Sequence, residues 1–85
     1  MKVITYTIVD KLGIHAYPAG KLVKKAGEFE SDIQIGKNGI MVNAKKIMGV
    51  MGLAVEQGDQ ISMTFQGTDE EQAAFVMESF LKENL

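Results

Sequence analysis

Cysteine is absent from this chain of 85 residues. Its absence excludes a disulfide framework, catalysis by a thiol and metal sites built from cysteine ligands. It also fits a reducing compartment, where disulfides are rare. The apolar share of 46% and the charged share of 24% are those of an ordinary globular domain. Because so short a chain builds one compact core, we expect a single domain over residues 1–85.

Arginine is absent as well, so all nine positive charges are lysines, and the formal net charge is −2. This balance argues against a protein that binds nucleic acid, whose partner surface is basic. Arginine is the usual bidentate partner of a phosphate group, whereas lysine offers a mobile point charge. The chain therefore has few side chains with which to grip a phosphate.

Long apolar runs are missing too. No stretch reaches the length that spans a bilayer. The first residues, "MKVITYTIVD", lack the long apolar run and the small-residue cleavage site of a signal peptide. We therefore expect a cytoplasmic protein with no membrane insertion.

Three segments predict strands, and the first and third of them alternate between apolar and polar residues, as half-buried strands do. They are "VITYTIV" (3–9), "IQIGKNGIMV" (33–42) and "QISMTFQG" (60–67). The second contains Asn38 and Gly39, the pair that best tolerates the positive φ angles of a tight hairpin turn. These segments predict four strands, two of them joined as a hairpin.

Helical spacing fills the intervals between the strands. The apolar stripe Ala19, Leu22, Val23 and Ala26 predicts a helix from about residue 16, with Gly27 as a left-handed C-terminal stop. "KKIMGVMGLAV" (45–55) predicts a short helix. Residues 68–71 resemble a capping box, in which Thr68 and Glu71 begin a last helix. The order β-α-β-β-α-β-α indicates an α+β fold, a two-layer α/β sandwich with helices over one face of the sheet.

The chain's one histidine and one proline lie in "GIHAYPAG" (13–20), at the turn from the first strand into the first helix. The first N–H groups of a helix have no internal partners and favour an anion there. Either Tyr17 caps this helix, with Pro18 as its first residue, or His15 caps it and the N–H groups of Ala16 and Tyr17 point at its side chain. A neutral imidazole is a nucleophile, so a phosphoryl group on His15 would be stabilised by this helix start. The competing interpretation is that His15 only caps the helix.

"GIHAYPA" followed by "VNAKKIMGVMGL" resembles the histidine-containing phosphocarrier (HPr) family of the bacterial phosphoenolpyruvate-dependent sugar phosphotransferase system, over essentially the whole chain. The resemblance implies an open-faced β-sandwich, with four antiparallel strands and three helices on one side. It implies that His15 is phosphorylated at Nδ1 by enzyme I and passes the group to enzyme IIA domains, without a cofactor. Ala16 and Tyr17 would bind the phosphoryl group. The docking residues would be Gly20, Lys24, Lys45, Ile47, Met48 and Met51, with Val50 and Leu53 facing inward.

Three residues depart from the family pattern. Tyr17 replaces an arginine that helps to hold the phosphoryl group, which predicts slower transfer; alternatively, Tyr17 is an exposed aromatic side chain suited to a partner. Leu12 replaces a serine or asparagine near the imidazole. Lys46 replaces a serine whose phosphorylation regulates the family's Gram-positive branch, so that input should be absent.

Two functions follow from these observations. The first is a monomeric phosphoryl carrier that is not itself an enzyme and has enzyme I and enzyme IIA as partners. The second is a regulatory or adaptor paralogue that binds a transcriptional regulator or a metabolic enzyme. A self-contained enzyme or a metal site is disfavoured, because His15 has no recognisable partner base or companion ligands in the sequence.

Overall fold

The computed structural model describes residues 1–85, which form four strands and three helices in the predicted order. The strands are β1 (Lys2–Thr7), β2 (Asp32–Lys37), β3 (Ile40–Asn43) and β4 (Gln60–Gln66). The helices are α1 (Ala16–Ala26), α2 (Ile47–Gly52) and α3 (Glu70–Asn84). No helix combines the length and the apolar character that crossing a membrane requires.

The strands form one antiparallel sheet in the order β1-β4-β2-β3. Met63 of β4 lies at its centre, opposite Ile4 of β1 on one side and Ile35 of β2 on the other. Because side chains alternate between the two faces of a strand, this register gathers the apolar residues of β2 and β4 on one face. The fully buried members of this face are Ile33, Ile35, Ile61, Met63 and Phe65.

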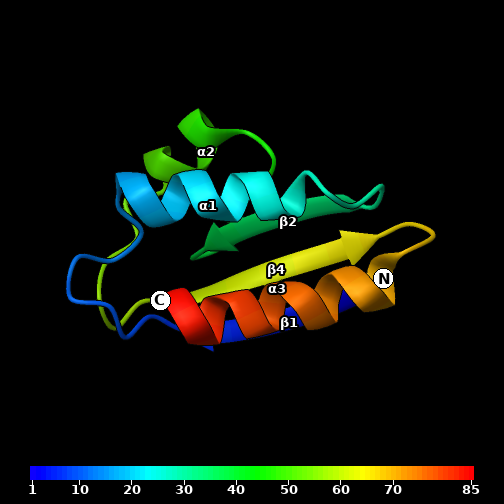
Figure 1. The fold of residues 1–85 in the computed structure, drawn as a ribbon. Helices are drawn as coiled ribbons and strands as arrows, with labels where there is room; N and C mark the ends of the chain where they lie inside the picture. The colour runs from blue at the N-terminus through cyan, green and yellow to red at the C-terminus, as the bar shows by residue number, and fades with distance from the viewer.

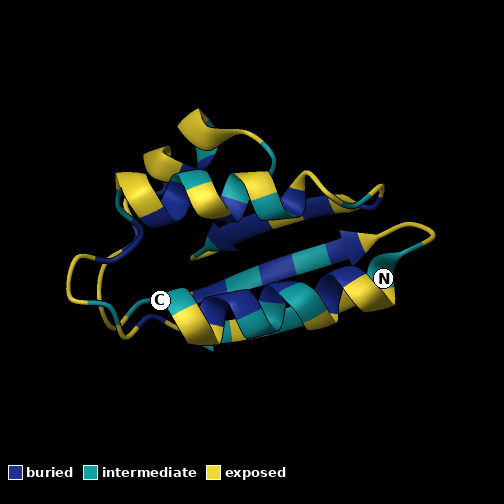
Figure 2. Cartoon of the chain, in the orientation of Figure 1, coloured by how far each residue is buried: buried dark blue, intermediate teal, exposed yellow.

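The three helices cover that apolar face and leave the other face of the sheet open (Figure 1). α1 lies between α2 and α3 and contacts both. Figure 2 shows that α1 and α3 turn their buried residues toward the sheet, whereas α2 is largely exposed. A cluster of 20 buried apolar residues fills the space between the two layers. The predicted two-layer sandwich is thus confirmed.

The first strand ends earlier than the alternation predicts. Ile8 is buried, but its N–H group donates to Asp59 outside the sheet ladder, at 2.9 Å. The N–H groups of Val9 and Asp10 both donate to the main-chain oxygen of Leu85, at 2.7 and 2.8 Å. Residues 8–10 therefore leave β1 and join the loop that leads to α1. Leu85, at the end of the chain, lies beside this loop (Figure 1).

Two predictions about helix ends are wrong. Gly27 caps α1 in a right-handed conformation, with φ −66° and ψ −12°, because its N–H group can still reach Val23 O without a left-handed turn. The capping box is absent, since α3 begins after Asp69 rather than Thr68. Glu70 Oε1 instead accepts a hydrogen bond from the N–H group of Gly67. The Asp69 carboxylate accepts from the N–H groups of Glu30 and Ser31, just before β2.

The hairpin turn between β2 and β3 is as predicted. Asn38 and Gly39 have φ values of 54° and 82°, which both belong to the left-handed region. The short helix is also present, although α2 spans only 47–52 of the predicted 45–55.

Candidate functional site

The loop between β1 and α1 depends on glycine at position 13. Gly13 has φ +67°, and a Cβ atom built on it would lie 2.1 Å from the carbonyl oxygen of Val55. That oxygen accepts the N–H group of the next residue, Ile14, at 3.1 Å. The loop that carries His15 is therefore pressed directly onto the segment before β4, and only glycine fits at the point of contact.

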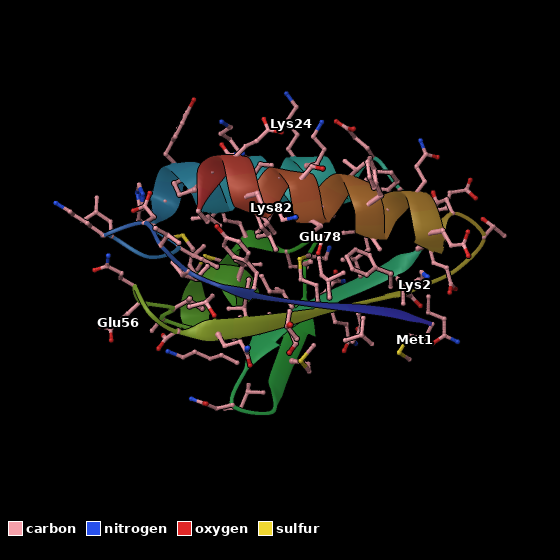
Figure 3. The ribbon with its side chains drawn as sticks, turned by 90° about the horizontal axis from the view of Figure 1, so that it is seen from below. Met1, Lys2, Lys24, Glu56, Glu78 and Lys82 are labelled. Carbon is pink, nitrogen blue, oxygen red and sulfur yellow. The ribbon has the colours of Figure 1, made fainter.

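A lysine and an aspartate hold this supporting segment in place. Lys37 Nζ donates to Ala54 O and to Asp59 Oδ2, both at 2.9 Å. The hydrogen bond from the Glu56 N–H group, followed by the hydrogen bond from Lys37, lowers the pKa of Asp59. Figure 3 shows Glu56 at the end of the molecule opposite Met1. These contacts fix the backbone against which the histidine loop packs.

His15 is the N-cap residue of α1. Its backbone is extended, with φ −94° and ψ −177°, and its carbonyl oxygen accepts the N–H group of Ala19 at 2.9 Å. Of the two registers that the sequence leaves open, the structure has this one, and Tyr17 lies inside the helix. The imidazole makes no capping hydrogen bond and is 37% exposed. A side chain that only capped the helix would bond to the N–H groups that follow it, and this one does not.

The helix start beside His15 is suited to an anion. The N–H groups of Ala16 and Tyr17 belong to the first turn and have no acceptor within the helix, and Pro18 has no N–H group to leave unpaired. The first turn contains no acidic residue, and Lys24 and Lys25 lie in the last turn. The helix dipole therefore acts at His15 without a competing carboxylate in this turn.

A residue that the sequence analysis missed, Asp10, lies beside the imidazole. Its Oδ1 is 3.8 Å from His15 Nε2 and accepts the N–H group of Leu12 at 2.8 Å. An aspartate whose carboxylate bonds the N–H group two residues later is a common turn arrangement. The signal was therefore present in "DKLGIH", but it predicts a turn and not a neighbour of the histidine.

Tyr17 is 74% exposed, which leaves its hydroxyl group open to solvent. The ammonium of Lys21, one turn further along α1, lies 5.3 Å from the centre of the tyrosine ring. The same ammonium donates to Asn84 Oδ1 of α3 at 2.9 Å. Such cation–π contacts orient the ring. Lys21 was not singled out from the sequence.

Three predicted docking residues form an exposed apolar surface on α2, which we call the α2 surface. Met48 is 81% exposed, while Ile47 and Met51 are each 40% exposed. Val50 and Leu53 are buried, as predicted. Gly20 of α1 faces this surface, since a Cβ atom on it would meet Ile47 Cδ1 at an ordinary contact distance of 3.9 Å. An apolar group of this kind commonly marks a partner site.

The two lysines predicted around this surface are placed differently. Lys45 is half-buried, and its ammonium donates to Phe29 O at 2.7 Å. Lys24 is exposed and lines a hollow of about 610 Å³ between α1 and α3. In Figure 3 its side chain points outward, away from the sheet. Lys24 is thus the more available of the two charges.

No group of three or more histidine, cysteine, aspartate or glutamate side chains lies together in a way that could hold a metal ion. What the fold and the site define is a small α/β protein with one partly exposed imidazole at the start of α1 and an apolar surface on the neighbouring helix α2. This arrangement fits the class of proteins that accept a chemical group on one side chain and pass it between partners.

Comparisons with known proteins identify the family within this class. Residues 3–83 match the family model described as the PTS HPr component phosphorylation site. The phosphocarrier protein HPr of Lysinibacillus sphaericus is 45% identical over 83 residues, which cover 98% of this chain and 94% of that protein. The chain therefore belongs to the HPr family, the phosphocarrier proteins of the phosphotransferase system. It is a phosphoryl carrier, and its family implies enzyme I and enzyme IIA as partners.

Solved structures agree with this assignment. The crystal structure of HPr from Thermoanaerobacter tengcongensis matches with a TM-score of 0.93 and 40% identity, over 98% of this chain and 93% of that one. Crh, a catabolite repression protein of Bacillus subtilis crystallised as a domain-swapped dimer, matches with a TM-score of 0.78 and 38% identity, over 94% and 92%.

Proposed function

We propose that His15 is the residue that accepts the phosphoryl group, through Nδ1, from enzyme I and then delivers it to an enzyme IIA. The observation that supports this most directly is the position of the imidazole. It is partly exposed at the N-cap of α1, makes no capping hydrogen bond, and adjoins backbone N–H groups that have no acceptor within the helix.

The phosphoryl group would be held mainly by the backbone. In this proposal the N–H groups of Ala16 and Tyr17 donate to its oxygens, and the helix dipole adds to their effect. Backbone donors are fixed by the fold, so they need no reorganisation when the charge arrives. The close packing of Gly13 against Val55 would help to hold the loop that leads into His15 and these donors.

Tyr17 would contribute its hydroxyl group and no charge. The ring is held by Lys21 and is exposed on the same helix start as His15. A hydroxyl group provides one donor where arginine provides a planar fork of five. We therefore expect transfer that is slower than in relatives with arginine at this position, but not abolished.

The α2 surface and Gly20 would form the docking face shared by the partners. Methionine suits such a face, because its flexible thioether adapts to several partner surfaces. The exposed ammonium of Lys24 would attract acidic side chains on a partner. Lys45 is part of the proposed face, although its ammonium also holds the Phe29 carbonyl.

The test is phosphorylation by a purified enzyme I and phosphoenolpyruvate, followed by intact-mass measurement. The proposal predicts an acid-labile gain of one phosphoryl group that is lost in His15→Ala. Circular dichroism of the variant serves as the folding control. No gain with active enzyme I would instead favour the adaptor function, in which the chain binds a transcriptional regulator, as a role in catabolite repression would require.

Three further assignments belong to this proposal. Residues 1–85 would act as one domain, which the single core cluster supports. The chain would act as a monomer in the cytoplasm, where its family's partners receive their phosphoryl groups. Sedimentation at working concentrations checks the monomer, since a swapped dimer would sediment as twice the mass.

A further inference from the structure

Asp10 is the ionisable side chain that faces the His15 ring, and its N–H group, its carbonyl oxygen and its carboxylate each make a hydrogen bond. Its N–H group donates to Leu85 O at 2.8 Å, and its carbonyl oxygen accepts the Gly13 N–H group at 3.0 Å. Its Oδ1 accepts the Leu12 N–H group at 2.8 Å. A carboxylate anchored in this way loses little additional freedom when it interacts with the ring, so even a modest attraction can orient the imidazole.

The Asp10 carboxylate approaches the Nε2 nitrogen of the ring, and the helix start follows His15 directly in the chain. Asp10 Oδ1 is 3.8 Å from Nε2, which is ion-pair range and longer than a hydrogen bond. In neutral imidazole one nitrogen carries a proton and the other a lone pair, and the neighbours of the ring decide which is which. A carboxylate favours a proton on the nitrogen that faces it, so Nε2–H is favoured and Nδ1 keeps its lone pair.

We propose that Asp10 is a positioning residue that holds the His15 ring with Nε2–H toward its carboxylate, and so presents the Nδ1 lone pair to the incoming phosphoryl group. This inference rests on the proposed function of His15. It also explains how the ring can be oriented although Leu12 has no polar side chain. The orienting group is the carboxylate of Asp10, two residues earlier, which is held by a hydrogen bond from the Leu12 N–H group.

The transfer step balances without a proton leaving the ring. The Nδ1 lone pair forms the new N–P bond, while the bond between phosphorus and the donor breaks and its electron pair leaves with the donor. The ring becomes a cation that keeps its proton on Nε2. Asp10 then faces a full positive charge, so its attraction is stronger after transfer than before. Delivery to the next acceptor reverses the same changes.

The test uses the fact that His15 is the chain's one histidine, so that the ring nitrogens give a single set of ¹⁵N signals. The tautomer populations are read from these signals at alkaline pH, where imidazole is neutral. Asp10→Asn keeps an oxygen that can accept the Leu12 N–H group but removes the charge. Asp10→Ala removes both. Asp32→Asn, an exposed aspartate on β2, controls for the change in net charge.

In Asp10→Asn we expect a smaller Nε2–H population than in the parent protein and phosphorylation by enzyme I that is about two- to fivefold slower, the range for a partly exposed ion pair. The tautomer difference should shrink in high salt, which screens exposed charges. Asp32→Asn should match the parent in both measurements. Asp10→Ala should lose at least as much rate as Asp10→Asn.

Unchanged tautomer populations in Asp10→Asn would overturn the role of Asp10, as would faster transfer, which would mean that the carboxylate mainly repels the phosphoryl group. Failure of the proposed function is distinguishable from both outcomes. In that case the parent protein itself would gain no phosphoryl group, whereas the ¹⁵N signals would still report whether Asp10 orients the ring.

Discussion

The close approach of Gly13 to the Val55 carbonyl predicts that Gly13→Ala lowers the free energy of unfolding by more than a positive φ alone would. A non-glycine residue in the left-handed region costs about 1–2 kcal/mol. The new methyl group would lie 2.1 Å from the Val55 oxygen, so the two segments must also move apart. Overpacking of this kind costs about 1–3 kcal/mol, and loss of the hydrogen bond from Ile14 to Val55 about 1 kcal/mol more. We therefore expect a loss of about 3–6 kcal/mol in the free energy of unfolding.

Gly39→Ala is the matched control. Gly39 also has a positive φ, of +82°, but a Cβ atom on it meets nothing within 4 Å. Gly39→Ala should therefore lower the free energy of unfolding only by the cost of the left-handed conformation, about 1–2 kcal/mol. Urea unfolding followed by circular dichroism measures both losses. A domain of this length has about 4–13 kcal/mol in total, so Gly13→Ala can approach complete unfolding. Equal losses in the two variants would refute the close packing of the histidine loop against Val55.

Three other predictions concern the anion site, the docking face and acid stability. Tyr17→Arg should speed phosphorylation by enzyme I about tenfold, because a charge-assisted hydrogen bond is restored; Tyr17→Phe should slow it, and a rate equal to the parent's would exclude a role for the hydroxyl group. Met48→Asp should weaken enzyme I binding about tenfold or more in titration calorimetry without lowering the Tm, whereas Val3→Asp on β1 should not weaken it. Hydrogen bonds from the Ser31 hydroxyl and then from the Glu30 N–H group hold the pKa of Asp69 below its usual range. The contribution of Asp69 to the free energy of unfolding is therefore complete above about pH 4, and it is lost as the pH falls through the lowered pKa. Asp69→Asn should therefore lower the Tm at pH 7 more than at pH 2, and equal shifts at both pH values would contradict this.

Much of the fold follows from local pattern. The alternation in "QISMTFQG" predicts β4 because each apolar residue lies on the one covered face, and Asn38 with Gly39 predicts the hairpin because the turn itself demands their φ values. The helix ends were less predictable. The Asp69 carboxylate accepts from Glu30 and Ser31, which are far away in the sequence, and the local bond at the helix start is made by Glu70 to the Gly67 N–H group instead of by Glu71.

The site was predictable where its chemistry is local. His15 was found because its position before Pro18 marks a helix start, and the α2 surface was found because a short helix cannot bury apolar residues all round. Asp10 and Lys21 were missed, since their relevance depends on distances to His15 and Tyr17 that arise only when the loop folds. The hydrogen bond from the Lys45 ammonium to the Phe29 carbonyl oxygen could not be predicted either, because it joins two segments that are 16 residues apart.

The most direct test of the account is a two-step transfer with labelled phosphoenolpyruvate, enzyme I and a purified enzyme IIA. The account predicts that label appears on this chain in an acid-labile form and leaves it when enzyme IIA is added. In His15→Ala it should appear neither on this chain nor on enzyme IIA. Label that remains on folded His15→Ala, or label that never passes to any enzyme IIA, would contradict the account.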